Sequence, residues 1–208
     1  MDIKNLPWTE IGLALGAIAC YCLIRRMGKE KRDESRSAKM MEKYATLTAE
    51  NLAATPDEEL VEAVVAHVLS RAAESRRPNP AAELAAMPQP YTVVYSVWAV
   101  CKEMARGSYA MLTHTATYGM VDCAVDGLPV IGAEATANAL AALRDAYLAK
   151  GDVETAENAY HLAVQQDCPL DLCVGYIRDH VAALLGEDTT ADAVAELPET
   201  TEESTDEA

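Results

Sequence analysis

An uncharged apolar run near the start of the chain constrains its architecture more than any other feature. Residues 11–24 read "IGLALGAIACYCLI", and Leu6-Pro7-Trp8 extends the apolar segment toward the N-terminus. As a helix rising about 1.5 Å per residue, residues 6–24 would cover about 28 Å, close to the roughly 30 Å hydrocarbon layer of a bilayer. Trp8 is a residue type enriched at headgroup interfaces, and Arg25 and Arg26 close the other end. We therefore predict that residues 1–24 form a single-pass transmembrane anchor.

The order of charges around this run predicts its orientation. Asp2 and Glu10 precede the run, whereas five bases follow it within residues 25–32. The positive-inside rule then places the N-terminus outside and the rest of the chain in the cytoplasm. A cleaved secretory or lipoprotein signal would carry its positive charge before the apolar run, so it fits less well. A soluble core helix is the third interpretation.

The composition of the remaining chain predicts an all-α fold. Apolar residues make up 50% of the sequence, and phenylalanine is absent. Alanine supplies much of the apolar content, and alanine-rich sequences poor in aromatic residues form helices better than strands. After the single-span helix we expect a charged juxtamembrane linker at 25–44, one compact multi-helix domain at 45–186, and a disordered acidic tail at 187–208.

Local signals place the helices within the domain. Thr55, Pro56 and Glu58 resemble a capping box that begins a helix. The apolar stretch from Tyr91 to Arg106 predicts a buried central helix, and Asp126 to Pro129 predicts a turn. We also expect one short helix among the prolines of residues 78–90, and a turn and a short helix between Gly107 and Gly119. Longer helices are expected at about 133–150, 152–165 and 171–185.

The charge distribution limits the partners of the domain. Residues 1–43 carry nine bases and six acids, residues 44–186 carry eighteen acids and eight bases, and the tail carries nine acids and no base. Direct nucleic-acid binding needs clustered Lys and Arg, so a protein with a basic surface is the expected partner. The candidate acidic face comprises Asp57, Glu58, Glu59, Glu62, Asp122, Asp126, Asp152, Glu154 and Glu157. Ordinary solvated helix N-termini also favour acids, which is the alternative interpretation of these residues.

Residues capable of catalysis or metal binding give little signal. No established catalytic or phosphate-binding motif occurs, and Cys168 and Cys173 lack the second pair that a zinc site requires. We expect no metal, no cofactor and no catalytic residue. His67 is predicted to be a hydrogen-bonded core histidine, and Glu103 a buried acid that accepts backbone N–H groups of the Gly107 turn. An enzyme with a pocket near Glu103 and His114 is the minority hypothesis.

The central block of the domain resembles a known family. From Val94 to Leu143 an apolar helix ends in Glu, a turn with Gly and an aromatic residue follows, and Ile-Gly-Ala opens a later helix. This pattern, with Tyr176 to His180, resembles a bacterial family of unknown function whose namesake member is an acidic DNA-mimic protein. The matching positions are Glu103, Gly107, Tyr109 (where the family has Phe), Gly119, Ile131, Gly132 and Ala133. The resemblance implies an all-helical domain and imitation of DNA by surface carboxylates.

A second, narrower pattern is similar to one tetratricopeptide repeat. It runs from Leu140 to Pro169, with alternating large and small residues at the packing positions of the repeat. No second copy follows at a 34-residue period, so a helical hairpin with the same packing is the simpler interpretation. A true repeat would imply a peptide-binding groove.

Together these patterns favour a non-enzymatic protein-interaction domain at the cytoplasmic face of a membrane. The alternatives are an acidic DNA mimic, a peptide-binding hairpin adaptor, and the enzyme near Glu103 and His114. No oligomeric state follows from the sequence.

Overall fold

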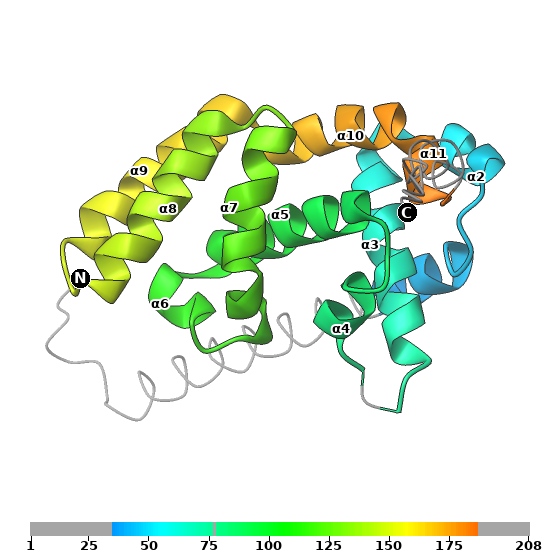
Figure 1. The fold of residues 1–208 in the computed structure, drawn as a ribbon, viewed down its shortest axis with the longest axis horizontal. Helices are drawn as coiled ribbons and strands as arrows, with labels where there is room; N and C mark the ends of the chain where they lie inside the picture. Colours follow the sequence, from blue (N-terminus) through cyan, green and yellow to red (C-terminus); the bar gives the residue numbers. More distant parts are fainter. Residues whose placement is uncertain (1–34, 77, 187–208) are drawn as a thin grey trace, which may run out of the picture.

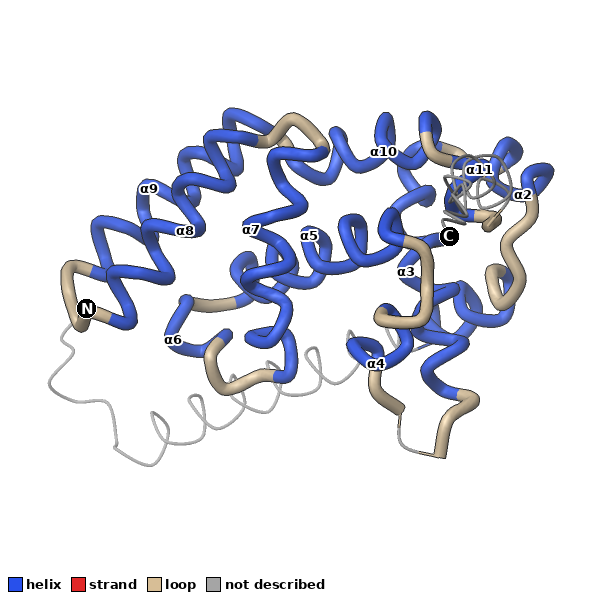
Figure 2. The backbone as a smooth tube through the Cα atoms, in the orientation of Figure 1, coloured by secondary structure: helices blue, strands red, loops and turns tan. Residues whose placement is uncertain are grey.

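The part of the chain that the computed structural model describes, residues 35–76 and 78–186, is all-helical (Figures 1 and 2). Helices account for 79% of it and it contains no strand, so the all-α prediction is confirmed. The predicted anchor at 1–24, residues 25–34 of the predicted linker and the acidic tail at 187–208 lie outside the described residues. Among the described helices, none has both the length and the apolar character needed to cross a bilayer.

Helix α5 (Gln89–Arg106) is the central element of the fold (Figure 1). Its Val94 and Val97 side chains are fully buried. Helices α3 (Asp57–Ala73), α7 (Val121–Val130) and α10 (Pro169–Asp179) all contact it. The apolar stretch from Tyr91 to Arg106 is therefore the buried central helix that the sequence predicts. Its enclosure by three helices explains why almost every side of this helix is apolar.

The packed domain begins earlier than residue 45. Residues 35–43 are helical, Met40 and Met41 pack on the core, and the Tyr44 side chain is only 1% exposed. The predicted linker at 25–44 is therefore wrong for residues 35–44. These residues lie against α3. Two methionines and a tyrosine supply the apolar contact that holds this segment to the domain.

The predicted cap of α3 is wrong. Pro56 occupies the N-cap position without a side-chain hydrogen bond, and the Thr55 hydroxyl instead donates to the Asn51 carbonyl at 2.6 Å. Thr55 is buried beside the Tyr44 hydroxyl, 3.2 Å away, so its side chain is directed into the core rather than toward the helix end. A reciprocal capping box does occur, one helix earlier, between Thr48 and Asn51 of α2 (Ala49–Ala54).

The short helices occur where the sequence predicts them, but the predicted turn at Asp126 to Pro129 does not. Those residues lie in α7, with Gly127 buried against Val93 and Ser96 of α5. Pro129 stands in the last turn of α7, and tertiary packing outweighs the turn propensity of the sequence. The short elements are α4 (Pro80–Leu84), α6 (Tyr109–Leu112) and the 3-10 helix η2 (Ala116–Met120).

The helices α8 (Glu134–Leu148) and α9 (Val153–Asp167) form a hairpin at one end of the molecule, on the left of Figure 1. From there α10 runs back across α5 to α3, and α11 (Val181–Leu184) contacts α2. The helix predicted at 171–185 is interrupted at His180. The His180 ring nitrogen bonds the Tyr176 carbonyl at 2.8 Å, which competes with continuation of the helix.

Candidate functional site

The acids on α3 are largely neutralised by bases of the same chain. Asp57 pairs with Arg178 at 2.8 Å, Glu59 with Lys43 at 3.2 Å, and Glu62 with Arg36 at 2.7 Å. Glu58 alone of the four makes no side-chain hydrogen bond or ion pair within the described residues. The beginning of α3 is therefore a surface of paired charges and not a free acidic face.

The remaining predicted acids gather where bases are scarce. Residues 107–168, which form α6, η2, α7, α8 and α9, carry eight acids and two bases. We call this region the acidic end. By contrast, residues 35–106 carry nine acids and eight bases. The negative charge of the domain is thus concentrated in one half of the described chain.

Several acids of the acidic end face solvent. The side chains of Asp122 and Asp145 are 79% and 66% exposed, and both pair with the single base Arg144, at 2.7 and 3.0 Å. Asp126, Glu134 and Glu154 are all exposed, and these three accept no side-chain hydrogen bond or ion pair from the described residues. Sequence analysis missed Glu134 and Asp145, because their helix has no local cluster of acids.

Three other acids of this region hold the fold together. Asp152 caps α9 by accepting the Thr155 N–H and hydroxyl at 3.0 and 2.7 Å, bonds that lower its pKa. Glu157 accepts the Tyr109 N–H of α6 at 3.3 Å. Asp167, at the end of α9, accepts the Thr136 N–H and hydroxyl at 2.7 and 2.9 Å and so caps α8. A partner would find these carboxylates already engaged.

At Glu103, one of the two residues of the hypothetical enzyme pocket, the carboxylate pairs with a neighbouring arginine. The prediction that the Glu103 carboxylate accepts N–H groups of the Gly107 turn is wrong: it accepts Arg106 at 3.3 Å, and the Gly107 N–H donates to the Glu103 backbone carbonyl. No hydrogen bond or ion pair joins Glu103 to His114 in the described chain. Nor does any group of three His, Cys, Asp or Glu residues there stand ready to hold a metal ion.

His67 is the hydrogen-bonded histidine that the sequence predicts. Its Nδ1 lies 2.9 Å from the Ala45 carbonyl and 3.2 Å from the Tyr44 carbonyl, so Nδ1 carries the proton and donates. Burial lowers the pKa of the ring, and the two carbonyls oppose this shift. The neutral ring contacts Tyr91, with centroids 5.6 Å apart. Its role is to join the segment around Tyr44 to α3.

The positions that carry the family resemblance fall into two groups. Glu103 and Gly107 end α5, and Tyr109 follows in α6, where it contacts Tyr118 of η2 edge-on at 6.4 Å. Gly119 lies in the same 3-10 helix. Ile131, Gly132 and Ala133 form the α7–α8 connection, separated from the first group by the ten residues of α7. The second group is a tight turn in which Gly132 has φ +86° and Ala133 is fully buried.

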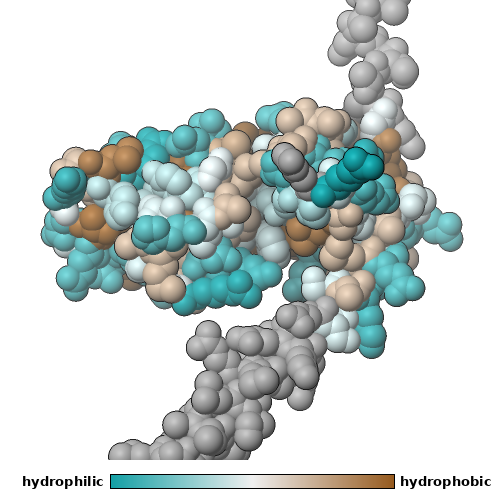
Figure 3. All heavy atoms as spheres, turned by 90° about the horizontal axis from the view of Figure 1, so that it is seen from below, coloured by the Kyte–Doolittle hydropathy of each residue, from teal (hydrophilic) through white to brown (hydrophobic). Residues whose placement is uncertain are grey.

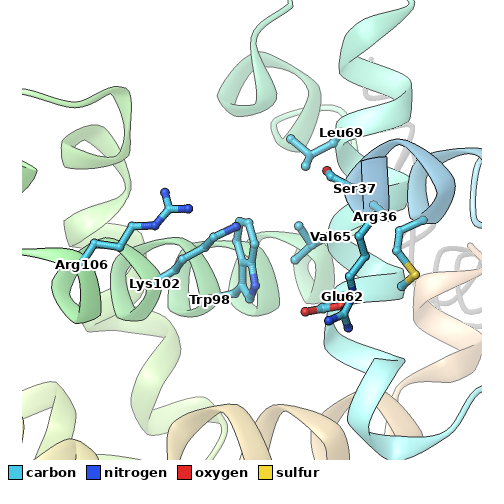
Figure 4. A pocket seen from close by; sticks show the side chains of 10 residues that line it. Arg36, Ser37, Glu62, Val65, Leu69, Trp98, Lys102 and Arg106 are labelled. Carbon is cyan, nitrogen blue, oxygen red and sulfur yellow. The ribbon is translucent and has the colours of Figure 1, made fainter. Parts of the chain in front are cut away.

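A basic pocket that the sequence analysis missed lies between α3, α5 and residues 36–40 (Figure 4). Its volume is about 250 Å³. Trp98, Lys102 and Arg106 follow one another along α5 on one side, opposite Val65 and Leu69 of α3. The Lys102 ammonium lies 4.2 Å from the centre of the Trp98 ring, and Arg36 and Glu62 close the rim. Spacing of Trp98, Lys102 and Arg106 by four residues is the sequence signal that indicates this shared face.

No family model, curated protein or solved structure matches this chain.

Proposed function

We propose that this domain is a non-enzymatic protein-interaction module whose acidic end binds a basic partner protein. One observation carries the proposal: residues 107–168 hold eight acids against two bases, while residues 35–106 are nearly balanced. Such an asymmetry creates a negative potential on one end of the molecule, which attracts and orients a positively charged partner. The expected contacts are the exposed carboxylates of Asp122, Asp126, Glu134, Asp145 and Glu154.

Apolar residues on the same hairpin suggest the character of that partner. Leu148 at the end of α8 and Leu162 in α9 are 65% and 67% exposed. Viewed from below, the end formed by α8 and α9 (left in Figure 3) shows hydrophobic patches among hydrophilic residues. A protein segment that combines Lys or Arg with apolar side chains would use both features. Binding that salt leaves unchanged would instead favour the peptide-binding hairpin adaptor.

DNA mimicry is a narrower form of the same hypothesis. A mimic must present many unpaired carboxylates on one rigid face, because duplex DNA carries about one charge per 1.7 Å. The ion pairs of Asp57, Glu59 and Glu62 remove most of the α3 contribution to such a face. Displacement of the captured protein by duplex DNA would favour mimicry, and retention would favour an ordinary protein–protein contact.

The test is capture from a cell extract with charge-matched variants of the full chain. E134Q/D145N/E154Q removes three charges from the acidic end, and E50Q/E58Q/E74Q removes three exposed charges elsewhere. The proposal predicts that the wild type captures a protein which E134Q/D145N/E154Q no longer binds and E50Q/E58Q/E74Q still binds. High salt should release this protein from the wild type. Equal capture by both variants would overturn the assignment of the acidic end.

We also propose that the N-terminal segment tethers this module to the cytoplasmic face of a membrane. The support is the apolar run at 6–24, bounded by Trp8 and by Arg25 and Arg26. The full chain is expected to float with neutral phosphatidylcholine vesicles and to resist extraction with salt or alkali. Recovery in the unbound fraction would contradict the tether without affecting the acidic end.

A further inference from the structure

We propose that the basic pocket between α3 and α5 is a docking site for the acidic tail of the same chain, residues 187–208. The pocket offers three cations, Arg36, Lys102 and Arg106, around apolar side chains that include Trp98 and Leu69. The only acid in its lining is Glu62, which pairs with Arg36 at 2.7 Å, and Arg106 also pairs with the neighbouring Glu103 at 3.3 Å. A ligand that fits this lining combines negative charges with small apolar residues.

The tail has that chemistry. It carries nine acids and no base. Its middle, "ADAVAELPE" from Ala191 to Glu199, places Val194 and Leu197 among Asp192, Glu196 and Glu199. Val194 and Leu197 would contact Trp98 and Leu69, and the tail carboxylates would lie near the positive charges of Lys102 and Arg106. The segment at 1–34 is a poorer candidate by composition, because its residues 25–34 carry five bases against the three acids Glu30, Asp33 and Glu34.

The tail starts close enough to reach the pocket. Gly186 lies beside His67 and Arg71 of α3 in a neighbouring hollow, while Ala66 and Leu69 of the same turn line the basic pocket. The path therefore leads around one helix, whose diameter with side chains is about 10–12 Å. A fully extended segment spans at most about 3.3–3.6 Å per residue, so the eight to eleven residues from Gly186 to Val194 and Leu197 reach up to roughly 26 to 40 Å.

Electrostatics and attachment both favour this site over others. The acidic end repels the tail, because residues 107–168 carry eight acids and two bases. Because the tail is attached, its concentration at the pocket is of the order of millimolar, so individually weak charge contacts suffice for occupancy. The tail would then cover Trp98 and shield the basic pocket from acidic competitors. This inference is independent of the proposed basic partner.

Zero-length carbodiimide cross-linking of the full chain tests the docking directly. The reagent joins a lysine amine to a carboxylate in contact with it, and mass spectrometry identifies the joined peptides. We expect Lys102 to be joined to Asp192, Glu196 or Glu199 in the monomer, with loss of these products in D192N/E196Q/E199Q. Lys150 is the matched control, because it is exposed on the acidic α8–α9 hairpin. Intramolecular docking would be overturned if Lys150 were cross-linked to the tail as often as Lys102. It would also be overturned if no cross-link to the tail formed, or if such cross-links occurred only in dimers.

Tryptophan fluorescence gives a second readout that does not depend on a reactive lysine. The chain has two tryptophans, so W8F leaves Trp98 as the sole reporter. In that background, V194E/L197E is expected to increase quenching of Trp98 by acrylamide, because the tail no longer covers the ring. V194A/L197A should have a smaller effect in the same direction. Unchanged quenching in V194E/L197E would contradict the proposal, and an unchanged circular dichroism spectrum shows that the domain is folded.

Discussion

Arg178 of α10 donates to the carboxylate of Asp57 at the start of α3, with 2.8 Å between Nη2 and Oδ1. The same guanidinium also donates to the Leu52 and Thr55 carbonyls, each at 2.7 Å. One side chain from the end of the described chain thereby closes the junction between α2 and α3. The two carbonyl bonds are partly buried, whereas Asp57 is 69% exposed. The carbonyl contacts should consequently contribute more stability than the ion pair.

Substitution of Arg178 tests this ranking. R178A is expected to lower the free energy of unfolding by about 2–3 kcal/mol, since hydrogen bonds from a charged donor contribute about 1.5–3 kcal/mol each and do not add fully. D57N should lower it by less than about 1 kcal/mol, the range of exposed ion pairs. Urea titrations followed by circular dichroism measure both values. Equal losses would show that the ion pair, and not the carbonyl contacts, stabilises the junction.

Two glycines of the family-like pattern should respond differently to alanine. Gly132 has φ +86°, a left-handed conformation that costs a side chain about 1–2 kcal/mol. Gly119 is not left-handed, and a Cβ there would meet nothing within 4 Å. We expect G132A to lose about 1–2 kcal/mol of stability and G119A to stay within about 0.5 kcal/mol of the wild type. Urea titrations measure the free energy of unfolding of both variants. A larger loss of stability in G119A than in G132A would contradict this expectation.

Tyrosine hydroxyls provide a further matched pair. The Tyr109 hydroxyl is buried without a hydrogen-bond partner among the described residues, whereas the Tyr91 hydroxyl donates to the Leu184 carbonyl at 2.9 Å. Y109F should therefore leave the free energy of unfolding unchanged or raise it by about 1 kcal/mol, while Y91F should lower it by about 1 kcal/mol. Thermal and urea unfolding measure the difference. Destabilisation of Y109F beyond that of Y91F would contradict the assigned hydrogen bonds.

His67 should make stability depend on pH. Burial lowers the pKa of its ring in the folded state below the usual 6.5, so the unfolded chain binds a proton more readily. The stabilising contribution of the neutral ring is complete above pH 6.5 and is lost as pH falls through the lowered pKa. H67N keeps a donor near the Nδ1 position without titrating. The wild type should lose more stability than H67N between about pH 7 and 5, and parallel losses would refute this role.

The sequence predicted the elements of the fold better than their charge relationships. Tyr91 to Arg106 was recognisable as a buried helix because nearly all of its faces are apolar. The helix across Asp126 to Pro129 was not recognisable, since it depends on tertiary packing that includes Gly127 against Val93 and the buried Leu128 side chain. The ion pairs of Glu59 and Glu62 join residues 16 and 26 positions apart, which no local pattern reveals. For that reason the acidic face predicted at α3 is neutralised, and the acidic end lies elsewhere.

The most direct test of the central claim is a titration with an oligolysine peptide, measured by calorimetry on the chain ending at Gly186, because the nine acids of residues 187–208 would bind the peptide themselves. The account predicts binding at low salt that E134Q/D145N/E154Q weakens strongly and E50Q/E58Q/E74Q weakens little. It also predicts loss of binding at about 1 M salt, where the Debye length falls to about 3 Å. Equal weakening in the two variants, or binding that persists at high salt, would contradict a basic-partner site at the acidic end.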